Sequence, residues 1–381
     1  MIYLDHAATS WPKPPEVIAA MTYFLDRIGG NPGRAGHRMS INAGRIVYKA
    51  RETLAEFFNA ADPLRVIFTS NATHAVNLAL HGLLRPGDHV VASGSEHNAV
   101  MRPLRFLEQS GVRVSLVPCD DCGIVDPNKI ERAVEKSTRL IVVKHTCNVT
   151  GTILPVAEIA AAARRAGTYL LVDAAQSAGA VHIDMQTMGI DLLAFTGHKG
   201  LQGPPGTGGL VIGERVRAED LAPLTRGGTG SRSESEFQPD DLPDKFESGT
   251  LNGPGIAGLE AGARFVLERG IEQIRTHEIA LAKKLTDGLG NIPGVRLYGP
   301  DDWERRTAVV SFTSDRHQTS EIGFRLDEEF GILCRVGLHC APAAHRAIGS
   351  FPGGTVRFAP GPQTCANEID AAVAAVARIL K

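Results

Sequence analysis

The sequence has few of the features that mark membrane, secreted or nucleic-acid-binding proteins. Its 381 residues contain no apolar run of about 18 or more, so we expect no membrane span. The polar N-terminus lacks the basic and apolar regions of a signal peptide. A net charge of only −2 offers no basic surface for nucleic acid. We therefore predict a cytoplasmic protein whose partners include neither nucleic acid nor a membrane.

Cysteine is also scarce. Six cysteines are scattered along the chain, at positions 119, 122, 147, 334, 340 and 365. In a chain of this length, such a pattern is typical of free thiols and not of a disulfide framework. Cys119 and Cys122 form a lone CxxC pair in a polar turn, without a second pair to complete a ligand set. We therefore predict no metal site and no redox centre there.

Glycine and proline are abundant, with 41 and 22 residues, beside 43% hydrophobic residues. This composition predicts a globular protein with many tight turns. Between residues 66 and 195, short apolar runs alternate with helical stretches. The alternation predicts βαβ units, and hence an α/β protein with a mostly parallel sheet and helices on both faces.

A second, smaller α+β unit is predicted after a long helical stretch at about residues 254–289. The chain is too long for one small core, so two domains are expected. We predict a large domain over residues 15–255 and a small domain over 256–381, joined by the N-terminal segment 1–14. Four strands and a final helix are predicted in the small unit, at residues 295–298, 308–312, 333–336, 355–358 and 367–380.

The most informative stretch follows the apolar run at residues 192–195. Thr196, His198 and Lys199 come directly after it, and a turn rich in glycine and proline continues the chain. A lysine at the end of a buried strand is costly to desolvate unless it has a task. One such task is a Schiff base, because a desolvated lysine loses its proton easily. The alternative is a surface lysine in an ordinary loop of an α/β protein.

Polar side chains also follow the other predicted strands, where ligands bind in open α/β sheets. Residues 69–73 open a helix whose amides would attract a phosphate, although they could form an ordinary N-cap. His97 could stack on a flat ring, or it could be an ordinary turn residue without a function. Asp173 needs a cationic partner, and a protonated pyridine nitrogen is one. Together with Lys199, these groups predict a site for pyridoxal phosphate (PLP).

With these residues in place, the chain resembles the PLP-dependent cysteine desulfurases, which belong to the class V aminotransferases of fold type I. The resemblance extends over nearly the whole chain and implies a seven-stranded sheet in the large domain. The segments around Asp173 and Lys199, at this separation, are highly specific to the group. The matching segments are residues 3–9, 30–32, 68–73, 96–97, 173–179, 197–199, 247–250 and 335–341.

The resemblance implies a role for each cofactor-binding residue. Lys199 is the Schiff-base lysine, Asp173 meets the pyridine nitrogen and His97 stacks on the ring. Thr250 reaches the phosphate of a neighbouring subunit, which implies a homodimer. The remaining implied contacts are the ring hydroxyl with Asn148 and Gln176, and the phosphate with Ala72, Thr73, Thr196 and His198.

Two further residues bear on the substrate. Arg357 lies inside a predicted strand, so it is either a carboxylate clamp or an arginine at a strand edge. Cys340 lies in a mobile-looking turn, and its alternative is a buried structural thiol. The resemblance favours the clamp, and aligns Cys340 with the cysteine that forms a persulfide. A reactive thiol needs nearby positive charge, which we expect from His339 and Arg335.

The implied activity is that of a cysteine desulfurase, in which L-cysteine becomes L-alanine and its sulfur passes to Cys340. Lys199 removes the Cα proton and His97 moves a proton at the thiol. The alternatives are an aminotransferase, a selenocysteine lyase or a cysteine/cystine β-lyase, in which Cys340 is dispensable. Two departures from the family pattern, at His74 and at Pro362–Gln363, bear on substrate preference more than on cofactor binding. The sulfur acceptor, presumed to be a protein, is left open by the sequence.

Overall fold

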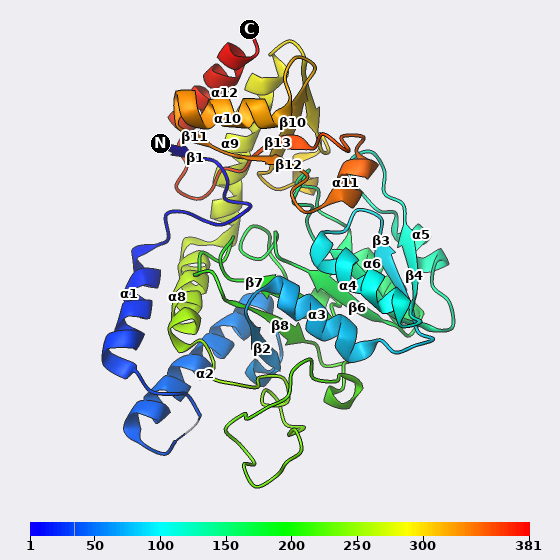
Figure 1. The fold of residues 1–381 in the computed structure, drawn as a ribbon, viewed down its shortest axis with the longest axis vertical. Coiled ribbons are helices and arrows are strands. Elements are labelled where there is room, and N and C mark those ends of the chain that lie inside the picture. The colour runs from blue at the N-terminus through cyan, green and yellow to red at the C-terminus, as the bar shows by residue number, and fades with distance from the viewer. Residues whose placement is uncertain (34) are drawn as a thin grey trace.

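The structure, a computed structural model, describes residues 1–33 and 35–381. A seven-stranded sheet lies in the lower part of the molecule and a four-stranded sheet in the upper part, with both chain termini near the latter (Figure 1). The large sheet has the order β2-β8-β7-β6-β5-β3-β4. All its pairings are parallel except those of β8 with β2 and β7. The predicted α/β class with a mostly parallel seven-stranded sheet is therefore confirmed.

Because β2, β3, β5, β6 and β7 run in one direction, their carboxyl ends meet at one edge of the sheet. The polar residues predicted to follow these strands are thus brought together. The strands are β2 (Val66–Thr69), β3 (His89–Ser93), β4 (Arg113–Val117), β5 (Thr138–Lys144), β6 (Tyr169–Asp173), β7 (Leu192–Thr196) and β8 (Gly208–Ile212).

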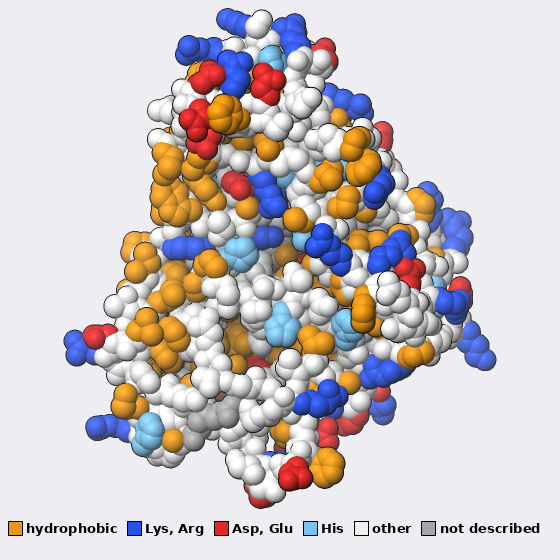
Figure 2. Space-filling view, viewed as in Figure 1, with side chains coloured by type: hydrophobic (Ala, Val, Ile, Leu, Met, Phe, Trp, Pro, Cys, Tyr) orange, Lys and Arg blue, Asp and Glu red, His pale blue; other side chains and the backbone are white. Residues whose placement is uncertain are grey.

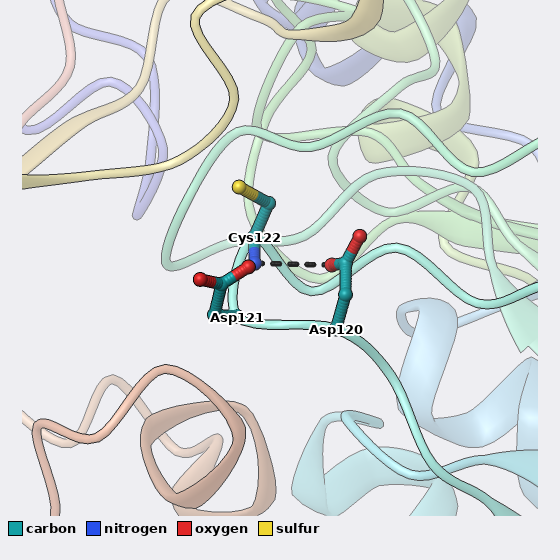
Figure 3. Close-up of side chains that lie close together, drawn as sticks. All are labelled: Asp120, Asp121 and Cys122. Carbon is teal, nitrogen blue, oxygen red and sulfur yellow. Dashed lines mark hydrogen bonds between the residues drawn. The ribbon is translucent and has the colours of Figure 1, made fainter.

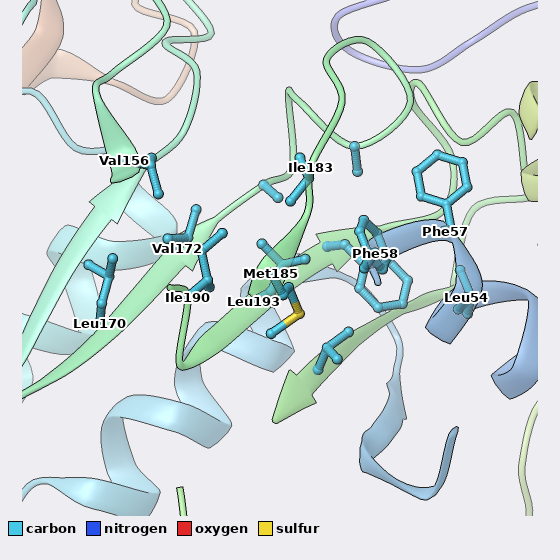
Figure 4. Packing of buried hydrophobic residues seen from close by; sticks show 14 of the residues in the cluster. Leu54, Phe57, Phe58, Val156, Leu170, Val172, Ile183, Met185, Ile190 and Leu193 are labelled. Carbon is cyan, nitrogen blue, oxygen red and sulfur yellow. The ribbon is translucent and has the colours of Figure 1, made fainter. Parts of the chain in front are cut away.

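The sheet is buried on both faces, as its nearly continuous apolar strands require. Alternate residues face opposite ways, so Val172 and Leu193 belong to one core and Leu171 and Leu192 to the other. Helices α2, α6 and α8 cover the first face, and α3 and α4 cover the second. Figure 4 shows the first core, where Phe58 of α2 packs against the strands. The helices of this part are α1 (Pro15–Tyr23), α2 (Arg38–Phe58), α3 (Ala72–Leu83), α4 (Asn98–Gln109), α5 (Pro127–Arg132), α6 (Val156–Arg165), α7 (Met185–Met188) and α8 (Gly253–Arg269).

The small unit contains an antiparallel sheet of order β12-β13-β10-β9 and a separate two-stranded sheet. In the latter, β1 pairs in parallel with β11, so the N-terminal segment contributes a strand next to the small unit's own chain. The predicted strand 333–336 is wrong in detail, because two strands, β11 and β12, occupy this region in different sheets. The elements are β1 (Ile2–Tyr3), α9 (Ile271–Gly290), β9 (Val295–Tyr298), β10 (Val310–Ser314), α10 (Thr319–Phe330), β11 (Ile332–Leu333), β12 (Arg335–Gly337), α11 (Pro342–Ala347), β13 (Thr355–Phe358) and α12 (Ala366–Ile379).

The predicted long helix at about 254–289 is two helices. Gly270 has φ of 84° and ends α8, and α9 begins at the next residue. The predicted boundary after residue 255 falls inside α8, whose Ile256, Leu259 and Val266 pack into the core of the large sheet. From these contacts we propose that the two units divide near Gly270 instead.

One ion pair fixes the end of the long loop between β8 and α8. Glu247 accepts hydrogen bonds from Arg51 of α2 and, at 2.6 Å, from the backbone N–H of Phe68. Both charged side chains are only 4% exposed. The loop is thereby attached to β2, the strand that leads into α3 and the predicted phosphate site.

Replacing Arg51 by methionine should destabilise the protein by about 3–5 kcal/mol, because Glu247 would be left as an uncompensated buried charge. The measurement is the free energy of unfolding from urea denaturation at pH 7. Arg113→Met is a matched control, because the Arg113–Glu135 pair is about half exposed and should contribute little. Equal effects of the two substitutions would contradict the argument.

Candidate active site

A cavity of about 240 Å³ lies at the carboxyl edge of the large sheet. It is lined by nine of the ten residues that the sequence analysis assigned to the cofactor; Thr250 is the exception. The volume and the mixture of polar groups suit one small molecule. The lining residues are Asn71, Ala72, Thr73, His97, Ala99, Lys144, Thr146, Asn148, Asp173, Ala175, Gln176, Thr196, His198 and Lys199.

Lys199 follows β7 and its amine faces the cavity from the same sheet edge as Asp173. Burial lowers the pKa of Lys199 to about 8, and the carboxylate of Asp173 opposes part of this shift. A substantial fraction of the amine is therefore neutral near pH 8, as a nucleophile must be. This geometry supports the predicted covalent role.

The backbone next to Lys199 is held by the N-terminal segment. The carbonyl oxygen of His198 accepts hydrogen bonds from Thr9 Oγ1 at 3.1 Å, Ser10 N at 2.9 Å and Lys13 Nζ at 3.0 Å. In addition, Gln176 Nε2 donates to Ala7 O at 2.9 Å. These bonds fix the loop that carries the lysine, a function that the sequence analysis did not assign to residues 7–13.

One end of the cavity is built for an anion. Asn71 caps α3 by accepting a hydrogen bond from His74 N at 2.9 Å, and the first-turn amides of Ala72 and Thr73 lie beside the cavity. Unpaired amides at the start of a helix attract phosphate. Thr196 and His198 line the same cavity. The ordinary N-cap and the anion site are thus compatible, because the cap uses the amide of His74 only.

His97 is the N-cap residue of α4, and its Nδ1 accepts a hydrogen bond from Ala99 N at 3.0 Å. Burial, followed by the positive charge of Lys199, lowers the pKa of His97 to about 4. The ring is therefore neutral at pH 7, and with Nδ1 as an acceptor its proton is on Nε2. A neutral imidazole suits stacking on a flat ring, and it can donate only through Nε2.

Asp173 ends β6 and is 6% exposed. Burial raises the pKa of its carboxyl group, while a hydrogen bond from Ala175 N and the charges of Lys199 and Lys144 act in the opposite direction. A buried carboxylate at a cavity wall calls for a cationic ligand. A protonated ring nitrogen would meet this requirement.

Arg357 lies in β13 and is fully buried. Its Nη2 donates to Asp5 Oδ1 at 2.8 Å and its Nη1 donates to the backbone oxygen of Asn148 at 2.9 Å. The edge-arginine alternative is therefore wrong. Arg357 is not among the residues that line the cavity, but it contacts Asn148, which is. Its Nε has no hydrogen-bond partner among the residues that the structure describes.

Cys340 is exposed, which excludes the buried structural thiol. Its Sγ lies 3.6 Å from Arg335 Nη2, and its backbone oxygen accepts a hydrogen bond from Asn98 N. Residues His339 and Cys340 both have positive φ angles, 47° and 57°, which non-glycine residues rarely adopt. Such conformations persist only where the surroundings hold them, and they occur often at functional sites.

The prediction that His339 supplies positive charge near Cys340 is wrong. The side chain is 3% exposed and its Nε2 is hydrogen-bonded to Thr355 Oγ1. Burial, reinforced by Arg357, lowers its pKa to about 2, so the ring is neutral. Arg335 remains as the cation beside Cys340. The backbone oxygen of His339 instead accepts a bond from Asn148 Nδ2 at 2.7 Å, which ties the cysteine loop to the cavity.

Thr250 is exposed, away from the cavity of its own chain, and Asn31 Nδ2 donates to its hydroxyl at 3.3 Å. The CxxC pair is divided. Cys119 Sγ contacts Ser95 Oγ at 3.1 Å in the interior. Figure 3 shows Cys122 close to the exposed residues Asp120 and Asp121, where Asp120 accepts a hydrogen bond from Cys122 N. The two sulfurs therefore have different surroundings.

Two contributors were missed by the sequence analysis. Asp5 was noted only as part of a matching segment, and nothing in the sequence indicates that it pairs with Arg357. Lys144 ends the buried strand β5, the same signal that singled out Lys199, yet it was not considered.

The chain belongs to the aminotransferase class-V family, whose family model matches residues 2–372. Two similar relatives are both named as cysteine desulfurases. A probable cysteine desulfurase of Methanothermobacter thermautotrophicus is 39% identical over 93% of this chain and 89% of its own length. A cysteine desulfurase of Dickeya dadantii is 33% identical over the whole chain and 92% of its own.

Solved structures agree with the sequence relatives. The apo cysteine desulfurase of Thermococcus onnurineus superimposes with a TM-score of 0.93 and 31% identity, over 100% of this chain and 94% of that one. The cysteine desulfurase CsdA of Escherichia coli, in an S-sulfonic acid form, gives 0.89 and 30% identity over 99% and 94%. The predicted resemblance to the cysteine desulfurases of class V is therefore confirmed.

Proposed function

We propose that this protein is a PLP-dependent cysteine desulfurase that converts L-cysteine to L-alanine and holds the released sulfur as a persulfide on Cys340. The observation that carries the proposal is the single cavity that Lys199, Asp173, His97 and the α3 N-terminus share. An exposed thiol beside an arginine supports the sulfur step. The names of the relatives point to the same reaction.

The residues of the cavity fit the cofactor on chemical grounds. The α3 amides, Thr196 and His198 would hold its phosphate, and Lys199 its aldehyde. Asp173 would hold the proton of the ring nitrogen, with His97 against the ring and Gln176 and Asn148 near its hydroxyl. When bound, PLP supplies an electron sink for the carbon next to the amino group.

The remaining work belongs to side chains of this chain. Arg357 would bind the substrate carboxylate, and Lys199 Nζ would remove the Cα proton. His97 Nε2 would exchange a proton with the substrate thiol. The thiolate of Cys340, stabilised by Arg335, would attack the substrate sulfur, so that the carbon–sulfur bond breaks and alanine leaves. A sulfur-acceptor protein would then discharge the persulfide.

A homodimer is part of the proposal. Thr250 does not reach the cavity of its own chain, as expected for a residue that serves the neighbouring subunit. Beside it, α1, the following turn of π-helix and α2 expose a large apolar surface, which forms orange patches over α1 in Figure 2. Exposed apolar side chains that gather on one face often mark a protein–protein contact. The exposed side chains are Ile18, Tyr23, Leu25, Met39, Ile41 and Tyr48, each at least 46% exposed.

We also propose a cytoplasmic setting. All six cysteines are free, as a reducing compartment would keep them. Among the residues that the structure describes, no helix is both long and apolar enough to traverse a bilayer.

The test is incubation of the purified, PLP-loaded protein with L-cysteine, with and without a thiol reductant, with alanine and sulfide measured separately. We expect one alanine per enzyme-bound sulfur without reductant, and continued turnover with sulfide release when reductant is present. Pyruvate in place of alanine would indicate a β-lyase, and a keto acid that retains the sulfur would indicate an aminotransferase. A parallel reaction with selenocysteine measures the preference between sulfur and selenium.

A further inference from the structure

A second buried lysine lines the same cavity as Lys199. Lys144 is 2% exposed and Glu96, its neighbour on the adjacent strand end, is fully buried. Desolvating two charges costs several kcal/mol unless each is closely paired and hydrogen-bonded. The reaction proposed above uses neither residue.

The contacts between the two strand ends are reciprocal. Lys144 N donates to Glu96 Oε1 at 3.0 Å, and Lys144 Nζ donates to Ser95 Oγ at 2.7 Å and also to Ser95 O. Glu96 Oε1 accepts a further bond from Ser93 Oγ. The turn between β3 and α4 is therefore attached to the end of β5 through both the backbone and the side chain of Lys144.

The residue after Glu96 in this turn is His97, the expected ring-stacking residue. Its position depends on the turn, because its own side chain is occupied with capping α4. On the other side of β5, Lys144 lies opposite Asp173, because β5 and β6 pair in parallel in this register. Lys144 thus connects the turn that carries His97 to the strand that ends at Asp173.

We propose that Lys144 is a positioning residue of the cofactor site, which fixes the His97 turn and supplies a cation that keeps Asp173 ionised. This inference rests on the proposed PLP site. The titratable groups around the ammonium are Glu96, His97, Cys119 and Cys147, besides Asp173. Burial raises the pKa of Glu96 to about 7, so its carboxyl group offsets only part of the charge of Lys144.

The test compares Lys144→Met, which keeps a similar volume without charge, with Lys129→Met on the exposed face of α5. PLP binding to the apo proteins is followed by absorbance titration. We expect Lys144→Met to weaken PLP binding by about 10- to 100-fold, the loss that is typical when a hydrogen-bond partner of a metal ligand is removed. Lys129→Met should bind like the wild type.

A second readout separates electrostatics from shape. Without the nearby cation, Asp173 holds its proton to a higher pH. The acid-side midpoint in the absorbance of the bound cofactor should therefore move upwards in Lys144→Met. Ser95→Ala removes one acceptor of Lys144 Nζ and keeps the charge, so it should weaken binding with an unchanged midpoint. This variant also provides a test if Lys144→Met does not fold.

Two outcomes overturn the inference. One is wild-type affinity and midpoint in Lys144→Met; the other is a loss of binding that merely follows a loss of helix content in the apo protein. The proposed function fails in a different way, because the wild type itself would then not take up PLP.

Discussion

Replacing Lys199 by alanine should abolish the visible absorbance of the PLP-loaded protein and reduce alanine formation from L-cysteine by at least about 10²–10⁴-fold. The lower bound is the effect of losing one acid–base group, and the loss of covalent attachment adds to it. The measurements are the absorbance spectrum after gel filtration and the rate of alanine release. Lys129→Ala, on the exposed face of α5, is the control for losing a lysine.

The pH dependence of cofactor uptake tests the same residue. Only the neutral amine attacks an aldehyde, and the pKa of Lys199 is lowered by burial to about 8. The second-order rate of PLP uptake should therefore rise with pH up to about 8 and then level off. A rate that continues to rise towards the ordinary lysine pKa above 10 would show that the amine is solvated, and the assignment would be wrong.

Replacing Cys340 by alanine should leave cofactor binding intact and abolish alanine release from L-cysteine. The physical reason is that Cys340 is outside the cofactor cavity, yet it is exposed beside Arg335 where a thiolate is stabilised. Cys365 is also exposed, at the start of α12, so Cys365→Ala is a matched control that should retain full activity. The measurements are PLP absorbance, alanine release, and mass spectrometry of the persulfide on the intact protein.

The outcome with Cys340→Ala distinguishes the proposed reaction from its rivals. Normal alanine release would refute the persulfide role. Normal selenocysteine cleavage together with lost cysteine turnover would assign the thiol to sulfur chemistry alone.

Much of the cofactor site could be predicted from the sequence, for a geometric reason. Parallel strands bring their carboxyl ends to one edge, so residues that follow separate apolar runs must meet. Asp173 ends β6 and Lys199 follows β7, and these two strands are hydrogen-bonded neighbours, so both residues could be placed at one edge from this part of the chain alone.

What the sequence did not reveal depends on contacts between distant segments or on burial. The pairing of Asp5 with Arg357 joins the two ends of the chain. The charge of His339 depends on how deeply the ring is buried, and a histidine beside a cysteine does not disclose that. Helix α10 was missed because it buries only Ile322 and Leu326 and contains a glycine, so its apolar periodicity is weak.

The attachment of the first residues has a consequence for synthesis on the ribosome. Strand β1 pairs with β11, and Asp5 with Arg357, so residues 2–5 can dock only after their partners in β11 and β13 have been made. Domains generally fold as units while the chain is being made. The large sheet can thus form first, and the segment before α1 joins the small unit later. A nascent chain that has not reached Arg357 therefore has the residues that line the cavity, all of which precede it, but not the partner of Asp5.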